Sequence, residues 1–253
     1  DKKLNDVFKK NKFYKICHLA AQPGVRYSLI NPLKYEYWNN VATVNILEGA
    51  RKFKIKDIVI ASSSSVYGNN KKVPFSETDN VDYPVSFYAA TKKANELYAH
   101  VYHKLYGLNI TCLRFFTVYG PWGRPDMAIF KFVDKIIKGE KIELYNYGNM
   151  KRDFTYISDI VKGVIKAIYK PFKYEIINLG NNRPVDLIRV VKIIEKELGK
   201  KARKKFIKMQ PGDVYRTCAN IKKAKRLLGF KPEVKIEEGI RRYIECIKII
   251  CTS

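Results

Sequence analysis

The chain has 253 residues, of which 46% are hydrophobic and 29% charged, so it can bury a core and is not a disordered chain. No apolar run is long enough to cross a bilayer, and the opening residues do not resemble a signal peptide, so no membrane partner is expected. The formal net charge of +25 favours anionic partners, but no aromatic series is interleaved with the basic clusters at 200–205 and 222–226, so nucleic-acid binding is not expected as the main role.

Short apolar strands alternate along the chain with longer helical patterns, which predicts a parallel sheet with covering helices. The chain opens on what looks like the helix that precedes a strand. In chain order, the expected elements are a strand at 15–19, a helix at 33–53, a strand at 57–61, a helix at 88–106, a strand at 109–115, a helix at 157–169 and a strand at 175–179. The fold class is therefore α/β, with a Rossmann-like parallel sheet.

The pattern changes after Gly120, where a loop rich in glycine and proline runs to Asp126. Helices are expected beyond it at 128–138, 185–198, 221–228 and 236–249. We therefore expect a sheet domain at 1–120 and a smaller C-terminal lobe at 121–253, with segments near 155–180 returning to the sheet domain.

A glycine-rich turn is missing from the sequence. A sheet domain that binds a dinucleotide normally begins with a strand, a Gly-rich turn and a helix whose N-terminus holds the pyrophosphate. Neither Gly-x-Gly-x-x-Gly nor Gly-x-x-Gly-x-x-Gly occurs in this chain. We expect the sheet to lack an opening βαβ unit of about 50–60 residues.

Tyr88 and Lys92 stand four residues apart at the start of a predicted helix, downstream of the serine run Ser62–Ser65. A free phenol has a pKa near 10, so ionisation at neutral pH requires that pKa to fall by about 3, which is worth about 4 kcal/mol. A cation at i+4 lies on the same helix face and favours the phenolate. The pattern predicts a phenolate that accepts a hydroxyl proton while hydride leaves for nicotinamide. Taken alone, it also fits a solvent-facing helix and an ordinary serine turn.

Several segments together resemble the extended short-chain dehydrogenases/reductases of the NAD-dependent epimerase/dehydratase family. They are His18–Ser28, Asn39–Asn40, Ser62–Gly68, Tyr88–Lys92, Leu113–Pro121 and Arg152–Tyr156. The likeness covers essentially the whole chain and is closest to UDP-glucuronate 4-epimerases, in which Gln-x-Gly-Val-Arg-Tyr-Ser and Gly-Arg-Pro-Asp-Met-Ala are characteristic. It implies an NAD-dependent isomerase acting on a UDP-sugar. Residues 1–120 would be a truncated NAD-binding domain. The 253-residue chain alone is expected to bind NAD poorly and to aggregate, because the missing strand leaves its neighbours' edges and apolar faces exposed.

The resemblance also implies roles for individual residues. Ser63, Tyr88 and Lys92 would be catalytic. The cofactor would be lined by Ala20, Ala21, Asn39, Ser62, Tyr88, Lys92 and Phe116. The sugar nucleotide would be held by Arg26, Ser64, Ser65, Thr117, Arg124, Arg152 and Asp213. Guanidinium groups suit a diphosphate because they pair with anionic oxygens in two places. Arg26 could instead bind a glucuronate carboxylate, and any one of these arginines could equally be a solvated surface residue.

The reaction within this family can be narrowed by the residues after Ser63. Nucleotide-sugar dehydratases and decarboxylases generally need an acidic residue there, and Ser64 and Ser65 cannot act as carboxylates. Oxidation at C4, rotation of the keto sugar and return of hydride to its other face favour a 4-epimerase, most similar to the UDP-glucuronate type. The alternatives are a non-catalytic remnant or basic nucleic-acid-binding protein of the same fold, and a 4-epimerase for another sugar such as UDP-galactose.

The remaining expectations concern metals, location and assembly. Glu96, His100 and His103 have helical spacing that could imitate a metal site, but no matching ligand set accompanies them, so no metal is expected. The five cysteines are scattered without a Cys-x-x-Cys pair, which suits the reducing cytoplasm. In relatives, the helices at 33–53 and 88–106 form a four-helix contact, so a homodimer is implied by the resemblance.

Overall fold

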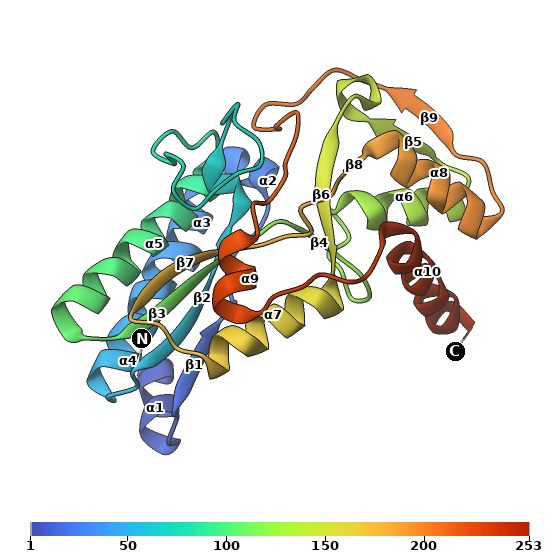
Figure 1. The fold of residues 1–253 in the computed structure, drawn as a ribbon. Helices are drawn as coiled ribbons and strands as arrows, with labels where there is room; N and C mark the ends of the chain where they lie inside the picture. The colour runs from blue at the N-terminus through green and yellow to red at the C-terminus, as the bar shows by residue number, and fades with distance from the viewer. Residues whose placement is uncertain (1, 253) are drawn as a thin grey trace. The chain divides into compact units, whose positions relative to one another are not determined.

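The computed structural model describes residues 2–252, which fall into two compact units (Figure 1). Unit 1 contains the chain up to Phe115, together with Lys162–Leu179 and Asn220–Phe230. Unit 2 contains Phe116–Val161, Gly180–Ala219 and the chain from Lys231 onward.

The centre of unit 1 is a four-stranded parallel sheet in the order β1-β2-β3-β7. Its strands are β1 (Lys15–His18), β2 (Asp57–Ser63), β3 (Asn109–Phe115) and β7 (Tyr174–Leu179). The expected α/β class with a parallel sheet is confirmed. Each expected strand is present, with ends that differ by at most a few residues. The strongly apolar β2 and β3 lie in the middle, where both faces of a parallel sheet are covered.

Helices pack on one face of this sheet through a shared apolar cluster. α1 (Lys2–Lys10), α4 (Ala42–Lys52) and α5 (Phe87–Tyr106) cover that face. Alternate strand residues point toward them, including Ile58 and Ile60 of β2 and Ile110 of β3. The other elements of unit 1 are α2 (Val25–Ile30), α3 (Pro32–Tyr35), the 3₁₀ segment η2 (Ser64–Tyr67), α9 (Lys222–Leu228) and the C-terminal part of α7 (Ile157–Tyr169).

The helix expected at 33–53 is present, but its middle is not α-helical. The structure divides this stretch into α3, a π-helical segment η1 (Glu36–Val41) and α4. Inside η1, Asn40 donates from Nδ2 to the Glu36 carboxylate at 2.7 Å, and Asn39 is fully buried. Hydrophobic periodicity does not reveal a π-helical turn, and such turns often occur at functional sites.

Unit 2 is built from two small sheets and three long helices. One sheet has the order β4-β6-β8, from β4 (Thr117–Tyr119), β6 (Lys151–Tyr156) and β8 (Pro184–Asp186). The other pairs β5 (Lys141–Leu144) with β9 (Arg203–Phe206), and η3 (Tyr145–Gly148) follows β5. The helices are α6 (Ala128–Ile137), α8 (Leu187–Leu198) and α10 (Ile236–Thr252). The helix expected at 185–198 begins later, because Pro184–Asp186 pair with β6.

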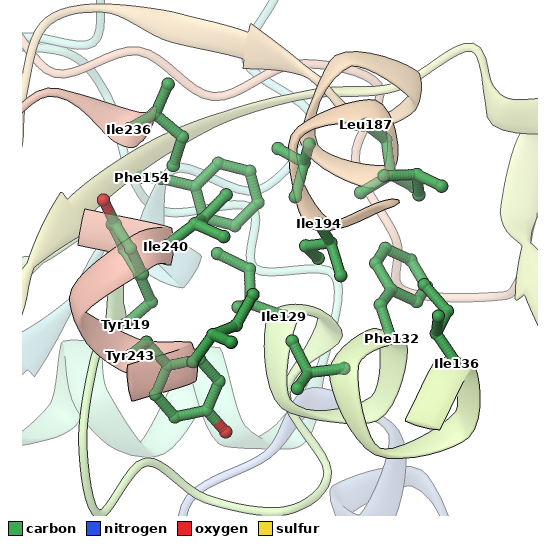
Figure 2. Packing of buried hydrophobic residues seen from close by; sticks show 14 of the residues in the cluster. Tyr119, Ile129, Phe132, Ile136, Phe154, Leu187, Ile194, Ile236, Ile240 and Tyr243 are labelled. Carbon is green, nitrogen blue, oxygen red and sulfur yellow. The ribbon is translucent and has the colours of Figure 1, made fainter. Parts of the chain in front are cut away.

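The apolar core of unit 2 lies among α6, α8 and α10 (Figure 2). Phe132 of α6, Ile194 of α8 and Ile240 of α10 belong to it, with Phe154 contributed by β6. The spacing of apolar residues along each helix places one face in the core. This packing fixes the strands that carry several predicted substrate residues.

The assignment of Asn220–Phe230 differs from the expected division. The sequence suggested that α9 belongs to the C-terminal lobe, whereas the structure places it in unit 1. The Asn220 amide donates to the Phe75 carbonyl at 2.9 Å, and its own carbonyl accepts from Asn178 of β7. A long-range contact of this kind leaves no local signal in the sequence.

Candidate active site

The predicted catalytic residues lie where β2 ends and α5 begins. Ser63 is the last residue of β2, and η2 follows directly. Helix α5 starts at Phe87 because the Ser86 hydroxyl caps it, accepting from the Ala89 amide at 3.1 Å. α5 packs against both β2 and η2. The structure therefore brings the serine run and the Tyr88–Lys92 pair to one end of the sheet in unit 1.

Lys92 is buried, with 3% of its surface exposed. Its ammonium donates to the carbonyl oxygen of Ala61 at 2.8 Å, the residue two before Ser63. Burial lowers the pKa of Lys92 from 10.5 to about 8, and the neighbouring Cys112 opposes this shift slightly. Below that pKa the side chain is cationic, so a buried positive charge stands at the carboxyl end of β2.

Tyr88 occupies the first turn of α5 and is partly buried. The Lys92 Nζ lies 6.0 Å from the centre of its ring, and the Tyr35 ring meets it edge-on at a centroid distance of 6.1 Å. Both the nearby ammonium and the positive end of the helix dipole favour an ionised phenol. The arrangement fits a group that accepts and returns a proton.

Ser63, Ser64 and Ser65 form the exit from β2. The Ser63 hydroxyl accepts from the Ser65 amide and donates to the Ser65 hydroxyl, both at 3.1 Å. Ser63 is 8% exposed, while Ser64 and Ser65 are partly exposed. A catalytic role for Ser63 and a substrate role for the other two stay predictions.

A second loop follows β1 and contains Ala20 and Ala21, which are exposed and partly exposed. Asn39 holds this loop, since its Oδ1 accepts from the Gln22 amide at 2.7 Å and its Nδ2 donates to the Gln22 carbonyl at 3.1 Å. The same Nδ2 donates to the Thr91 hydroxyl at 3.0 Å, on α5. Asn39, which was predicted to line the cofactor, therefore connects the loop after β1 to α5, the helix that carries Tyr88.

Two further predicted residues of unit 1 have defined positions. Arg26 lies in α2, in the loop-and-helix segment after β1. The Ser62 hydroxyl points inward and donates to Glu96 Oε1 at 2.6 Å. A cofactor contact from Ser62 stays a prediction, and its hydroxyl proton has a buried acceptor instead.

The other five predicted residues belong to unit 2. Phe116 is buried and packs near Gly180, while Thr117 opens β4. Arg124 pairs with Asp126 in the loop after β4 and shares a small hollow with Thr117, Phe130 and Tyr243.

Arg152, on β6, is held by main-chain oxygens. Its Nη1 donates to the carbonyls of Lys151 at 3.0 Å and Tyr215 at 3.3 Å. Asp213 lies in the loop after β9, with its amide donating to the Gln210 carbonyl. Their predicted contacts with a sugar nucleotide stay predictions.

Asp153 is a buried carboxylate of unit 2 that the sequence motif did not single out. Its oxygens accept from the amides of Asn181, Asn182 and Ala219 at 2.7 to 3.0 Å. Burial raises its pKa to about 6, and the three amide donors oppose that rise. Asp153 therefore joins three separate segments of the chain.

His18 ends β1 and is another buried group that pattern reading passed over. Its Nε2 lies 3.1 Å from the Thr43 hydroxyl. Burial lowers its pKa to about 4, and the charge on Lys92 lowers it further. His18 is therefore neutral at physiological pH and adds no second positive charge beside Lys92.

The candidate metal residues have other partners. Glu96 is paired with Arg114, His103 Nδ1 lies 2.9 Å from the Leu108 carbonyl, and His100 packs edge-on against Tyr174. Across residues 2–252, no group of three or more His, Cys, Asp or Glu side chains is arranged to hold a metal ion. None of the helices in the described part of the chain is long and apolar enough to span a membrane.

The donor set around Lys92 fits the ribose of a nicotinamide nucleotide. An ammonium has three protons, and one of them is used by the Ala61 carbonyl. The two remaining donors match the two hydroxyls of a ribose. Because the ammonium is buried, a hydrogen-bonding partner there is favourable.

The chain is similar in sequence to a known protein family and to individual proteins along most of its length. A family model described as GDP-mannose 4,6 dehydratase matches residues 1–243. Protein MJ1055 of Methanocaldococcus jannaschii is 61% identical over 228 residues, which cover 90% of this chain and 70% of that protein. A UDP-glucuronate 4-epimerase of Thermodesulfobacterium geofontis is 45% identical over 246 residues, covering 97% and 76%.

A solved structure is also similar to this chain. The Bacillus cereus UDP-glucuronic acid 4-epimerase, in complex with UDP-glucuronic acid and NAD, superposes with a TM-score of 0.92 at 35% identity, covering 98% of this chain and 78% of that one.

Proposed function

Because the chain belongs to the NAD-dependent epimerase/dehydratase family of extended short-chain dehydrogenases/reductases, we propose that it inverts C4 of a UDP-sugar. We propose UDP-glucuronate as the substrate and UDP-galacturonate as the product. The observation that carries the proposal is the buried Lys92 ammonium, bonded to the Ala61 carbonyl and close to the Tyr88 ring. The sugar assignment rests on relatives of 45–47% identity that bear the name UDP-glucuronate 4-epimerase.

In this proposal Tyr88 accepts the proton of the sugar 4-hydroxyl and later returns it to the 4-keto sugar. Lys92 keeps the phenol ionised and donates to the nicotinamide ribose. Ser63 donates to the sugar oxygen and holds it beside Tyr88. NAD, when bound, accepts a hydride from C4 and gives it back, so it is regenerated in each turnover.

Epimerisation is favoured over dehydration by the side chains after Ser63. The matching family model is named for a dehydratase, and elimination of water requires a proton to be removed from the carbon next to C4. Ser64 and Ser65 occupy the η2 positions where an acid would be needed. A serine hydroxyl has no charge to accept that proton, so the keto sugar is expected to be reduced again without losing water.

The proposed assembly is a homodimer formed through α5. Leu97, Val101 and Leu105 recur every four residues on this helix and are 54%, 47% and 68% exposed. An apolar stripe of this kind is costly to leave in water. Trp38 and Val41 of η1, which packs against α5, are also exposed. A cytoplasmic location stays a prediction.

The test is incubation of the protein and NAD with UDP-glucuronate, UDP-glucose, UDP-N-acetylglucosamine and GDP-mannose. Proton NMR of the products reads the configuration at C4. We expect UDP-galacturonate from UDP-glucuronate, and no product from the Tyr88→Phe variant. Inversion of UDP-glucose alone would reassign the sugar. A 4-keto-6-deoxy product from GDP-mannose, or no conversion of any UDP-sugar, would overturn the proposal.

A further inference from the structure

A row of buried polar side chains crosses the sheet of unit 1 near the carboxyl ends of its strands. Ser62 of β2 is in register with Arg114 of β3, which is in register with Asn178 of β7. All three are at most 3% exposed. Two residues earlier, on the same face of the sheet, Ile60 is paired with Cys112 and Cys112 with Ile176. On this face of the sheet, hydrogen-bonding side chains therefore replace apolar ones at Ser62, one residue before Ser63.

Glu96 of α5 joins two members of this row. Its Oε1 accepts from the Ser62 hydroxyl at 2.6 Å and from Arg114 Nε at 2.8 Å, and its Oε2 accepts from Arg114 Nη2 at 2.8 Å. Both members of the ion pair are 2% exposed. A buried ion pair is often no more stabilising than apolar residues of the same volume, so stability is a weak reason for its presence.

Tyr67 joins the other side of the row. Its hydroxyl donates to Asn178 Oδ1 at 2.7 Å, and the Arg114 guanidinium lies 4.8 Å from the centre of its ring. Burial raises the pKa of Tyr67 to about 12, so the hydroxyl keeps its proton at physiological pH. Asn178 is fixed in turn, since its Nδ2 donates to the carbonyls of Phe75 and Asn220.

These hydrogen bonds fix the segment Ser63–Ser65 on both sides. Ser62 precedes Ser63–Ser65 and is fastened to Glu96, while Tyr67 follows them and is fastened to Asn178. Glu96 also lies four residues after Lys92, whose ammonium holds the Ala61 carbonyl. Consecutive residues of β2 are thus attached to consecutive turns of α5. The attachment fixes the distance between the strand that carries Ser63 and the helix that carries Tyr88.

We propose that Ser62, Glu96, Arg114 and Tyr67 form a positioning network that sets the place of Ser63 relative to Tyr88 and Lys92. The inference rests on the proposed epimerase function. A displacement of about 1 Å in a reacting group can reduce a rate by about 100-fold. Removing one hydroxyl from the network is therefore expected to lower kcat more than it changes KM.

The test uses Ser62→Ala and Tyr67→Phe, each of which removes one hydroxyl. The matched control is Asn109→Ala, which removes the 2.9 Å bond to Asp57 at the opposite end of the same strand pair. Turnover of UDP-glucuronate and hydrogen exchange of residues 61–68 are measured for each variant. We expect kcat to fall by about 10- to 100-fold in both test variants, with KM within about threefold. Exchange should rise at 61–68 in these two and not in the control.

Normal kcat in both test variants would overturn the inference. So would equal losses in the control with faster exchange throughout unit 1, because that result indicates general destabilisation. If the unaltered protein converts no UDP-sugar, the proposed function fails, and hydrogen exchange alone then tests the network. Localised loosening at 61–68 in Ser62→Ala would then support the network, and unchanged exchange would refute it.

Discussion

Replacing Lys92 by methionine should make the protein more stable while it destroys activity. Burial lowers the pKa of Lys92 from 10.5 to about 8, and that difference corresponds to roughly 3 kcal/mol of destabilisation when the group is charged. Methionine fills a similar volume without charge. It loses the bond to the Ala61 carbonyl, which costs about 1–2 kcal/mol. The net expectation at pH 7 is a gain of about 1–2 kcal/mol, with turnover reduced more than about 100-fold.

The pH dependence of this gain identifies its cause. The pKa of Lys92 is lower in the folded protein than in the unfolded chain, so between about pH 8 and 10.5 the unfolded chain binds more protons. The stability contributed by Lys92 therefore rises across that window, as the buried charge is lost. The advantage of Lys92→Met should shrink from pH 7 to pH 10.

Urea unfolding at pH 7 and pH 10, followed by circular dichroism, measures the free energy of unfolding directly. The control is Lys93→Met, since Lys93 lies next in sequence and pairs at 3.3 Å with the exposed Asp82. That pair should contribute less than about 1 kcal/mol, so Lys93→Met should remain close to the unaltered protein in stability. A Lys92→Met variant that is less stable than the unaltered protein by the same amount at both pH values would refute the reasoning.

Three other outcomes are expected. Tyr88→Phe should abolish turnover and leave UDP-sugar affinity by calorimetry within about threefold; near-normal turnover would remove Tyr88 from the mechanism. Asp153→Asn should lower the free energy of unfolding by about 1–3 kcal/mol because at least one of three buried amides loses its acceptor. The control is Asp134→Asn, in an exposed pair with Lys138, which should hardly change the free energy of unfolding. An equal loss of stability in the two variants would contradict the role given to Asp153. Val101→Glu with Leu105→Glu should convert a dimer to monomer in sedimentation, and a monomeric unaltered protein would contradict the proposed assembly.

The elements of unit 1 could be predicted where the signal was local. Continuous apolar runs marked β2 and β3, and the helical pattern expected at 88–106 corresponds to α5 within one residue. Short exposed strands gave no such signal: β9 (Arg203–Phe206) is exposed throughout and its sequence reads as a basic cluster. The pairing of β9 with β5 depends on residues far apart in the chain.

The candidate site was predictable to a similar extent. The spacing of Tyr88 and Lys92 gave their shared position on α5, but nothing in that spacing showed that Lys92 would bind the Ala61 carbonyl. Glu96 also follows Lys92 by four residues, so the same spacing places it on that face of α5. Arg114, a charged residue within the apolar β3, was a second sign of a buried polar contact. Their partnership with Ser62 follows from strand register, which sequence patterns alone do not fix.

Two buried cations lie on the same side of this sheet, and their partners distinguish their purposes. Arg114 is neutralised by Glu96 through two hydrogen bonds, so its charge is used within the protein. The Lys92 ammonium instead donates to a neutral carbonyl, that of Ala61. A cation that is buried without a carboxylate lowers stability, and its field acts on nearby ionisable groups with little screening. Tyr88 is the phenol beside it, so the energetic cost of burying Lys92 is explained if that charge serves the phenolate.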